Sequence, residues 1–482
     1  MDMRESQPMN RTRLLRVAAA GIAALLAGCS MIPTYERPTA PVAASFSVYV
    51  GATQEAPAVS ADAAPAASVA WQNFFSDTRL KRLIGLSLSN NRDLRVAVLN
   101  IEQARAQYQI RRADQLPGVN GVFSGSRAPA ANGATTSLYT VGLAVTAYEL
   151  DFFGRVSSLK EAALGQYLAT EEGRKTAQIS LISSVATSYL SILADDELIN
   201  ITRQTLATRQ ESVKLAKLRF DNGVTSELDY QQAVSLLEAA RVAYSQQQRQ
   251  RALDENALTL LVGQPLAGDE LPPASAAQPA SLAQFEPMAP VPAGLPSDLL
   301  ANRPDIRQAE QLLLASNANI GAARAAFFPR ISLTVGVGSV SGQLSGLLKS
   351  GSWGLTVAPQ LLLPIFDYGR NNAGLDTARA GRDIAIAQYE KSIQTAFREV
   401  ADALATRTTL ADQLQSQQAQ ANAEAVRFRL SDLRYQNGIS SYLDLLDAQR
   451  SLFAAQQAVV QTRLAQLQSQ VGLYRALGGG WN

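Results

Sequence analysis

The stretch that decides the fold is LRFDNGVTSELD at residues 218–229, because it recurs as LRYQNGISSYLD at residues 433–444. Seven of the twelve positions are identical, and the offset between the two copies is 215 residues. The same offset relates FGR at 153–155 to YGR at 368–370, and an offset of 212 relates DLR at 93–95 to DIR at 305–307. A period this long exceeds any solenoid unit, so the chain consists of two similar halves in tandem.

The placement of proline predicts long helices in both halves. None of the 20 prolines lies between residues 130 and 264 or after 364, whereas eight lie between 265 and 296. Since proline costs about 3 kcal/mol inside a helix, the proline-free tracts rich in Ala, Gln, Leu and Arg indicate helices. Residues 157–220 would form a helix about 96 Å long at about 1.5 Å per residue, and 371–435 nearly the same. Such helices are typical of coiled coils or elongated bundles, with the Asn-Gly pairs at 222–223 and 437–438 as the reversals.

The last predicted helix carries a heptad pattern. Arg450 and Gln457 are its polar exceptions, and a heptad sustained this long predicts knobs-into-holes packing. Its other a and d positions are apolar: Leu443, Leu446, Phe453, Val460, Leu464, Leu467, Val471 and Tyr474.

Before each long helix the hydrophobic period changes to two. Apolar and small polar residues alternate over 139–147, 331–338 and 353–358, with a weaker companion at 119–125. These lengths approach the roughly 9–11 residues of a tilted transmembrane strand, so strand pairs are predicted at about 117–153 and 329–366. Two surface hairpins on a soluble protein are the alternative interpretation of the same pattern.

Closure of the sheet limits how four strands can enter a membrane. The smallest membrane barrels have about eight strands, and an open edge in lipid leaves backbone groups without partners. Two copies of the chain would give a barrel of about eight strands, filled by side chains, whereas three copies would give about twelve strands and a lumen. We therefore predict an α+β chain that contributes four strands to a twelve-stranded trimeric barrel, continued by a long helical coiled-coil barrel.

The N-terminus has the pattern of a processing signal. Arg11, Arg13 and Arg16 precede an apolar run at 17–27, too short to span a bilayer as a helix, and LAGC follows at 26–29. LAGC resembles the bacterial lipobox, which implies cleavage before Cys29 and its lipidation as a diacylglycerol thioether with an N-acyl group. Ser30 in the next position implies the outer membrane as the address. A small buried side chain is the alternative role for this cysteine.

Composition excludes several classes of function. The 482 residues include 43 Lys and Arg against 41 Asp and Glu, one Cys and no His. A net charge of +2 gives no drive toward polyanions, so no nucleic-acid partner is expected. Without His, and with a single Cys, the commonest general base and metal ligands are missing, and no phosphate loop or nucleophile motif is present. We expect no enzyme activity, no metal and no cofactor other than the covalent lipid.

From Cys29 to its end the chain resembles an outer membrane factor of the TolC family, in the OprM-like lipoprotein branch (the NodT type). This resemblance implies a homotrimeric duct in the outer membrane and periplasm. It also implies two partners, a periplasmic membrane-fusion adaptor protein and an inner-membrane pump of the resistance-nodulation-division class, for export of antibiotics, dyes and detergents. Besides the lipobox, the motifs that carry it are NRDLR at 91–95, ELDFFGR at 149–155, RPDI at 303–306, GAARAAFFP at 321–329, LDAQR at 446–450 and ALGGGW at 476–481.

The resemblance also implies a periplasmic gate at Leu443, Asp447 and Arg450. Spacings of four and seven residues keep all three on roughly one helix face. The first half has Leu228, Gln232 and Ser235 at these positions, so only the second half carries charges there. An exposed ion pair and one ordinary seam leucine are the alternative interpretation.

The resemblance further implies that the helix tips face the adaptor protein. Simple turn chemistry is an equally weighted alternative for these residues, since Asn-Gly pairs form turns without any partner. The candidates are Arg219, Asn222 and Gly223 in the first half, and Arg434, Asn437 and Gly438 in the second.

The predicted organisation has five parts. Residues 1–28 are the signal peptide, 29–70 a lipidated extended tether, 71–264 the first repeat, 265–298 a proline-rich equatorial connection and 299–482 the second repeat. Two alternative functions stay open, the exit duct of a type I protein or peptide secretion system and a lipoprotein that acts as a periplasmic spacer or adhesin.

Overall fold

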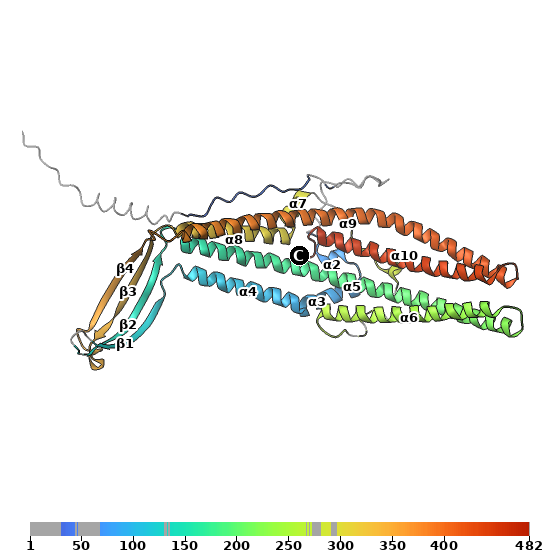
Figure 1. Cartoon of the computed structure of the whole chain (residues 1–482), viewed down its shortest axis with the longest axis horizontal. Coiled ribbons are helices and arrows are strands. Elements are labelled where there is room, and N and C mark those ends of the chain that lie inside the picture. Colours follow the sequence, from blue (N-terminus) through green and yellow to red (C-terminus); the bar gives the residue numbers. More distant parts are fainter. Residues whose placement is uncertain are drawn as a thin grey trace, which may run out of the picture. The chain divides into compact units, whose positions relative to one another are not determined.

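The computed structural model describes residues 30–43, 46, 68–129, 133, 135–266, 268, 270–271, 281–290 and 296–481. The predicted signal peptide and Cys29 lie outside the described residues. The order of elements in the first half, α4-β1-β2-α5-α6, recurs in the second as α8-β3-β4-α9-α10 (Figure 1). The contacts divide the chain into two compact units, each of which draws on both halves. One unit comprises Met1–Thr39, Asn100–Glu171 and Gln308–Glu390, and the other comprises Ala40–Leu99, Glu172–Arg307 and Lys391–Asn482.

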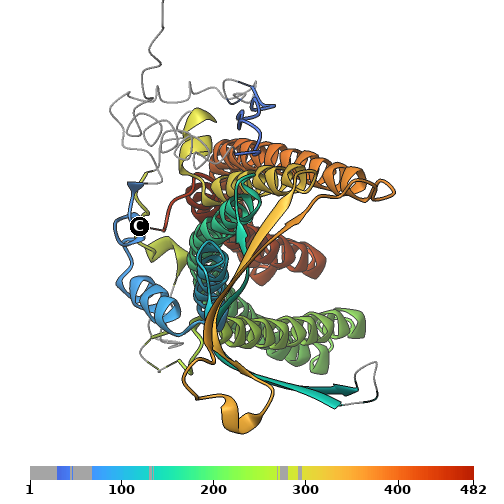
Figure 2. The same cartoon turned by 90° about the vertical axis from the view of Figure 1, so that its left-hand side faces the viewer.

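The first unit contains one antiparallel sheet in the order β1-β2-β3-β4. Its strands are β1 (Val119–Pro129), β2 (Thr135–Leu150), β3 (Arg330–Ser341) and β4 (Trp353–Leu362). The strands of the two halves meet where β2 pairs with β3, with Val141 opposite Ser339 and a register shift between Val145 and Tyr148. Figure 2 shows this curved sheet. The four strands predicted from the alternation are confirmed.

Residues 30–37 form an extended segment that docks on the helices of the same unit. Arg37 donates from Nη2 to Glu310 on α8 (Pro304–Ala325) at 2.7 Å, and from Nε to the Tyr389 hydroxyl on α9 (Arg370–Gln436) at 3.2 Å. Gly321 on α8 allows this approach, because a Cβ there would lie 2.6 Å from Ile32 Cγ1. The first part of the predicted tether is therefore extended and bound along helices.

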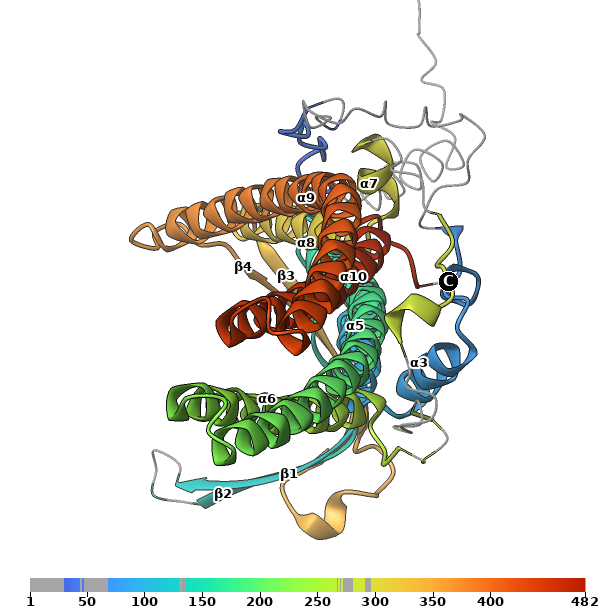
Figure 3. The ribbon, with the colours of Figure 1, turned by 90° about the vertical axis from the view of Figure 1, so that its right-hand side faces the viewer.

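The second unit contains two antiparallel helical hairpins, formed by α5 (Arg155–Asp221) with α6 (Glu227–Val262) and by α9 with α10 (Tyr442–Ala476) (Figure 3). Helices α5 and α9 have 67 residues each and begin in the first unit. Helix α5 has an 18-residue window apolar enough to cross a bilayer, but 56% of that window is buried inside the protein. The shorter helices are α2 (Trp71–Phe74), α3 (Thr78–Asn90), α4 (Arg92–Ala113) and α7 (Pro296–Asn302).

The C-terminal motif belongs to the core of the second unit. The Tyr474 ring stacks on Phe74 at 4.0 Å, and its hydroxyl donates to the Val69 carbonyl at 2.5 Å. Arg303, 7% exposed, donates to Asp305, to Glu399 and to the Ala476 carbonyl. The arginine of the RPDI motif is therefore buried and ion-paired, and its hydrogen bond to the Ala476 carbonyl fixes the end of α10.

The heptad seam of α10 begins one turn later than the sequence predicts. Leu446, Val460, Val471 and Tyr474 are buried, whereas Leu443 is 59% exposed. The reason is that Tyr442 and Leu445, rather than Leu443, form the buried face of α10 at this end and pack in a cluster with residues of the other helices. Leu443 is thus not a seam residue within one chain.

Candidate channel gate and helix tips

Both hairpins reverse through the same helix-ending motif. Val224 N–H donates to the Arg219 carbonyl at 2.8 Å and Gly223 N–H to the Phe220 carbonyl at 2.9 Å, the pair of bonds of a Schellman motif. In the second tip the bonds from Ile439 and Gly438 are equivalent. The glycines have φ of 71° in both tips, a conformation that disfavours other residues.

The tip asparagines complete these turns. Asn222 Nδ2 donates to the Leu218 carbonyl, and Asn437 Nδ2 to the Leu433 carbonyl, each at 2.7 Å. The following helices start with a serine cap at Ser226 and at Ser441, and the second is a complete capping box. Four of the six predicted tip residues, the two asparagines and the two glycines, therefore have a structural role in the turns.

The two arginines of the tips differ in their surroundings. The guanidinium of Arg219 lies over the ring of Tyr435, 4.6 Å from its centroid, and so joins the first tip to the second. Arg434 is exposed. Unlike Arg219, Arg434 has no aromatic ring beneath its guanidinium among the described residues.

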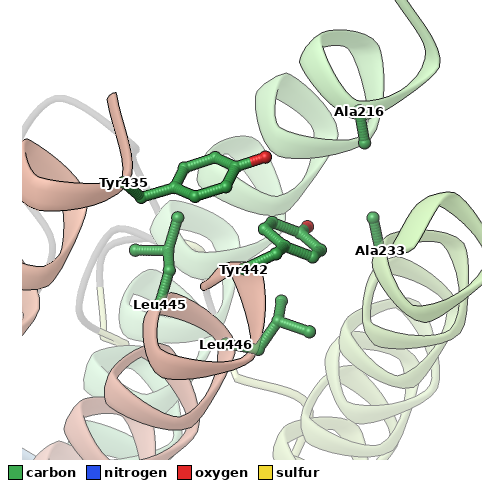
Figure 4. Close-up of a cluster of buried hydrophobic side chains, with 6 residues drawn as sticks. All are labelled: Ala216, Ala233, Tyr435, Tyr442, Leu445 and Leu446. Atoms are coloured by element: carbon green, nitrogen blue, oxygen red, sulfur yellow. The ribbon is translucent and has the colours of Figure 1, made fainter. Parts of the chain in front are cut away.

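A hydrophobic cluster joins the two tips (Figure 4). Leu446 is 1% exposed and Leu445 is 3% exposed, and both lie beside Tyr442. Burial raises the pKa of Tyr442 to about 12. The other members are Ala216 and Ala233 from the first hairpin and Tyr435 from the second.

The three gate candidates lie on the opposite, exposed side of α10. Leu443, Asp447 and Arg450 are all exposed, while Leu445 and Leu446 between them are buried. The sequence spacing therefore places the three on one face, as predicted. That face of α10 is exposed within a single chain.

Asp447 pairs with Arg427 on α9 within the same chain. Arg427 Nη1 also binds Glu424 at 3.2 Å. Sequence reasoning missed Arg427, although a signal for it exists. Arg427 and Asp447 are each ten residues from Asn437, and two positions equidistant from a reversal face each other across a hairpin.

The described part of the chain contains no group of three or more His, Cys, Asp or Glu side chains placed to hold a metal ion. The tips combine apolar packing, turn bonds and exposed charges.

Comparison with known proteins identifies the family. The family model described as "Outer membrane efflux protein" matches residues 83–264 and 295–479. The chain is 49% identical over 472 residues to the probable efflux pump outer membrane protein TtgC of Pseudomonas putida, covering 96% of this chain and 95% of the relative. It is 45% identical over 473 residues to the outer membrane protein OprJ of Pseudomonas aeruginosa, covering 97% and 96%.

Solved structures agree with this assignment. A membrane protein from Pseudomonas aeruginosa matches with a TM-score of 0.85 and 43% identity, covering 93% of this chain and 100% of that one. The open state of the MtrE outer membrane channel of Neisseria gonorrhoeae matches with a TM-score of 0.84 and 40% identity, covering 94% and 99%. The predicted α+β channel fold is confirmed, and the chain belongs to the outer membrane efflux protein family.

Proposed function

We propose that three copies of this chain form the outer-membrane exit duct of a tripartite multidrug efflux pump of the resistance-nodulation-division class. The duct gives antibiotics, dyes and other small toxic compounds a path through the periplasm and the outer membrane. Its partners are a periplasmic adaptor protein and an inner-membrane pump. Relatives named as antibiotic and solvent efflux pump outer membrane proteins support this role.

The observation that carries the proposal is the sheet. Among the described strands, β1 pairs only with β2 and β4 only with β3, so the sheet has two open edges. Its strands expose large apolar side chains, among them Phe123, Leu143, Trp353 and Leu355. Such a surface suits lipid, and lipid requires the edges to pair. Joining four strands from each of three copies satisfies both demands.

The N-terminus supplies a second membrane contact in this proposal. Cleavage before Cys29 and acylation of its thiol and amino group would anchor each copy, since each buried CH₂ contributes about 0.8 kcal/mol. The docked segment 30–37 supports a fixed position for such an anchor. A radioactive fatty acid should label the wild-type protein and not the Cys29→Ala variant. Labelling that persists in Cys29→Ala would contradict acylation at Cys29.

The duct is closed at rest by the second hairpin. Three symmetry copies of Leu443 form an apolar constriction, and Asp447 and Arg450 add a ring of charge beside it. The exposed position of all three on α10 supports this assignment. Asp447→Ala combined with Arg450→Ala should leave assembly intact and raise single-channel conductance in planar bilayers. Unchanged conductance would remove the gate assignment.

The tips face the adaptor protein. Arg219, Arg434 and the two Asn-Gly turns form the end of each hairpin, and the exposed Arg434 is the residue best placed for a partner. Arg434→Glu keeps the turn intact and should lower drug resistance and the capture of the adaptor protein. Full resistance in that variant, and in one with a bulky residue at Gly223 or Gly438, would leave turn chemistry as the sole role of the tips.

The first test is the efflux of a fluorescent dye from cells that lack the gene, with and without the wild-type copy. Slow efflux that the copy restores is the expected result. Unchanged efflux, together with exported proteins missing from the medium, would instead identify the duct of a secretion system.

A further inference from the structure

Helix α5 carries a buried cation, Arg209, that forms no ion pair with any residue that the structure describes. Arg209 is only 5% exposed. Its Nη1 donates to the Leu236 carbonyl at 2.8 Å, and its guanidinium carbon lies 5.5 Å from the centroid of the Phe453 ring. Its Nε is buried and has no hydrogen-bond partner in the part of the chain that the structure describes.

The neighbouring charges do not neutralise Arg209. Acidic side chains on the helices around Arg209 have other partners: Glu424 on α9 and Asp447 on α10 bind Arg427, and Glu238 on α6 binds Arg241. Burial lowers the pKa of Arg209, and the charge of Arg450 lowers it further. A buried guanidinium next to a second cation is unfavourable unless an anion joins it, because an uncompensated buried charge costs several kcal/mol.

The guanidinium lines a cavity that has room for such an anion. The cavity has a volume of about 140 Å³. Its apolar walls are Ile201, Phe428, Leu452 and Phe453, and its polar rim consists of Gln204, Thr205, Thr208, Gln449 and Gln456. A cavity of roughly 150 Å³ holds a benzene ring. Two aromatic walls and a cation at one side fit a flat apolar body with a negative end.

One of the polar side chains that line the cavity has a hydrogen-bond acceptor without a partner among the described residues. Gln449 lines it, is 8% exposed, and directs its Nε2 to the Ser212 hydroxyl at 3.4 Å. Its Oε1 is buried without a partner among the described residues. A ligand with a carboxylate and a hydroxyl donor would supply hydrogen-bond partners for both Arg209 Nε and Gln449 Oε1.

We propose that this cavity, between α5 of the first hairpin and α9 and α10 of the second, binds a small aromatic carboxylate with a hydroxyl group. The carboxylate pairs with Arg209, the ring lies against Phe428 and Phe453, and the hydroxyl donates to Gln449. The site adjoins the exposed face of α10 that carries the gate candidates, because Gln449 precedes Arg450 in the chain and the charge of Arg450 acts on Arg209.

Calorimetric titration of the purified full-length protein in detergent, at low chloride, tests the site. The probes are benzoate, 3- and 4-hydroxybenzoate, neutral benzamide and acetate. We expect benzoate to bind at millimolar concentration, one hydroxybenzoate to bind at least threefold more tightly, and benzamide and acetate to bind at least tenfold more weakly than benzoate.

Variants assign the site to its residues. Arg209→Gln should weaken benzoate binding at least tenfold, whereas Arg209→Lys keeps the charge and most of the binding. Gln449→Leu should abolish the preference for the hydroxyl and leave benzoate binding intact. Arg203→Gln, on the same helix but outside the cavity, is the matched control and should change nothing.

Three results would overturn the proposal. If acetate and benzoate bound equally well, the apolar walls would not contribute to binding. If Arg209→Gln bound benzoate as tightly as the wild type, the anion would bind at another place. Absence of binding, with a trimer destabilised by Arg209→Gln, would assign the guanidinium to a carboxylate of another copy of the chain.

Discussion

The two hairpin tips have the same backbone and different side chains. Both end in a Schellman motif with glycine φ of 71°, and both restart with a serine cap. Yet Arg427 and Asp447 form an ion pair in the second hairpin, where the first has Ser212 and Gln232 at the positions 215 residues earlier. The turn residues that the two tips share thus define the shape of each tip, and the residues that differ between them give one hairpin a charged face.

The largest expected effect concerns the packing of the second tip. Leu446 is 1% exposed, whereas the repeat-equivalent Gln231 is exposed. Leu446→Ala should lower the free energy of unfolding by about 2–5 kcal/mol, because it removes a buried side chain and leaves a cavity. Denaturant unfolding in detergent, followed by helical circular dichroism, measures the change.

Gln231→Ala is the control for this change and should alter stability by less than about 0.5 kcal/mol. Equal losses in the two variants would mean that the tips are packed alike, which would contradict the asymmetry of the cluster.

A second difference lies farther along the hairpins. Asp195 on α5 is 6% exposed and hydrogen-bonds to Asp254 on α6, whereas the second half has Leu410 and Ser469 at these places. Burial, and then the Asp254 carboxyl, raise the pKa of Asp195 to about 8. A carboxyl whose pKa is higher in the folded state than in the unfolded state favours folding at low pH, so its contribution is lost as pH rises from about 4 to 8.

Asp195→Asn should therefore stabilise the protein by about 1–3 kcal/mol at pH 8, since a neutral amide replaces a carboxyl whose charged form is penalised by burial. It should have little effect at pH 4, where the carboxyl is protonated. Unfolding at the two pH values tests this, with Glu238→Gln, an exposed pair partner of Arg241, as the control for loss of charge. A pH-independent difference would show that Asp195 does not change its protonation on folding.

The turn glycines should behave alike in the two tips. A Cβ at Gly223 or Gly438 would meet no described atom within 4 Å, so the cost of alanine is backbone strain alone. Each single substitution should lower the free energy of unfolding by about 1 kcal/mol, the lower end of the cost of a left-handed conformation. A loss at one tip more than twice that at the other would mean that the turns are not equivalent.

Features that depend on neighbouring residues were predicted from the sequence, whereas features that depend on contacts between distant residues were not. Local signals, such as proline placement, the Asn-Gly reversals and alternation by two, predicted the long helices and all four strands, because each acts within a few residues. The position of Leu443 outside the packed seam was not predicted, since Tyr442 displaces it through contacts with the other hairpin. Arg427 was missed for a related reason: its partner lies 20 residues away across a turn, and only the antiparallel register connects them.

The smallest expected effect on stability belongs to that ion pair. Asp447 and Arg427 have side chains 57% and 45% exposed, so Asp447→Asn should change the free energy of unfolding by less than about 1 kcal/mol. Its effect on single-channel conductance should nevertheless be an increase, because the charged face of the second hairpin is the part of the tip that the first hairpin lacks. Glu238→Gln removes an equally exposed pair from the first hairpin and should leave conductance unchanged. If both variants raised conductance alike, loss of any surface charge would suffice, and the comparison of the two hairpins would no longer explain which of them closes the duct.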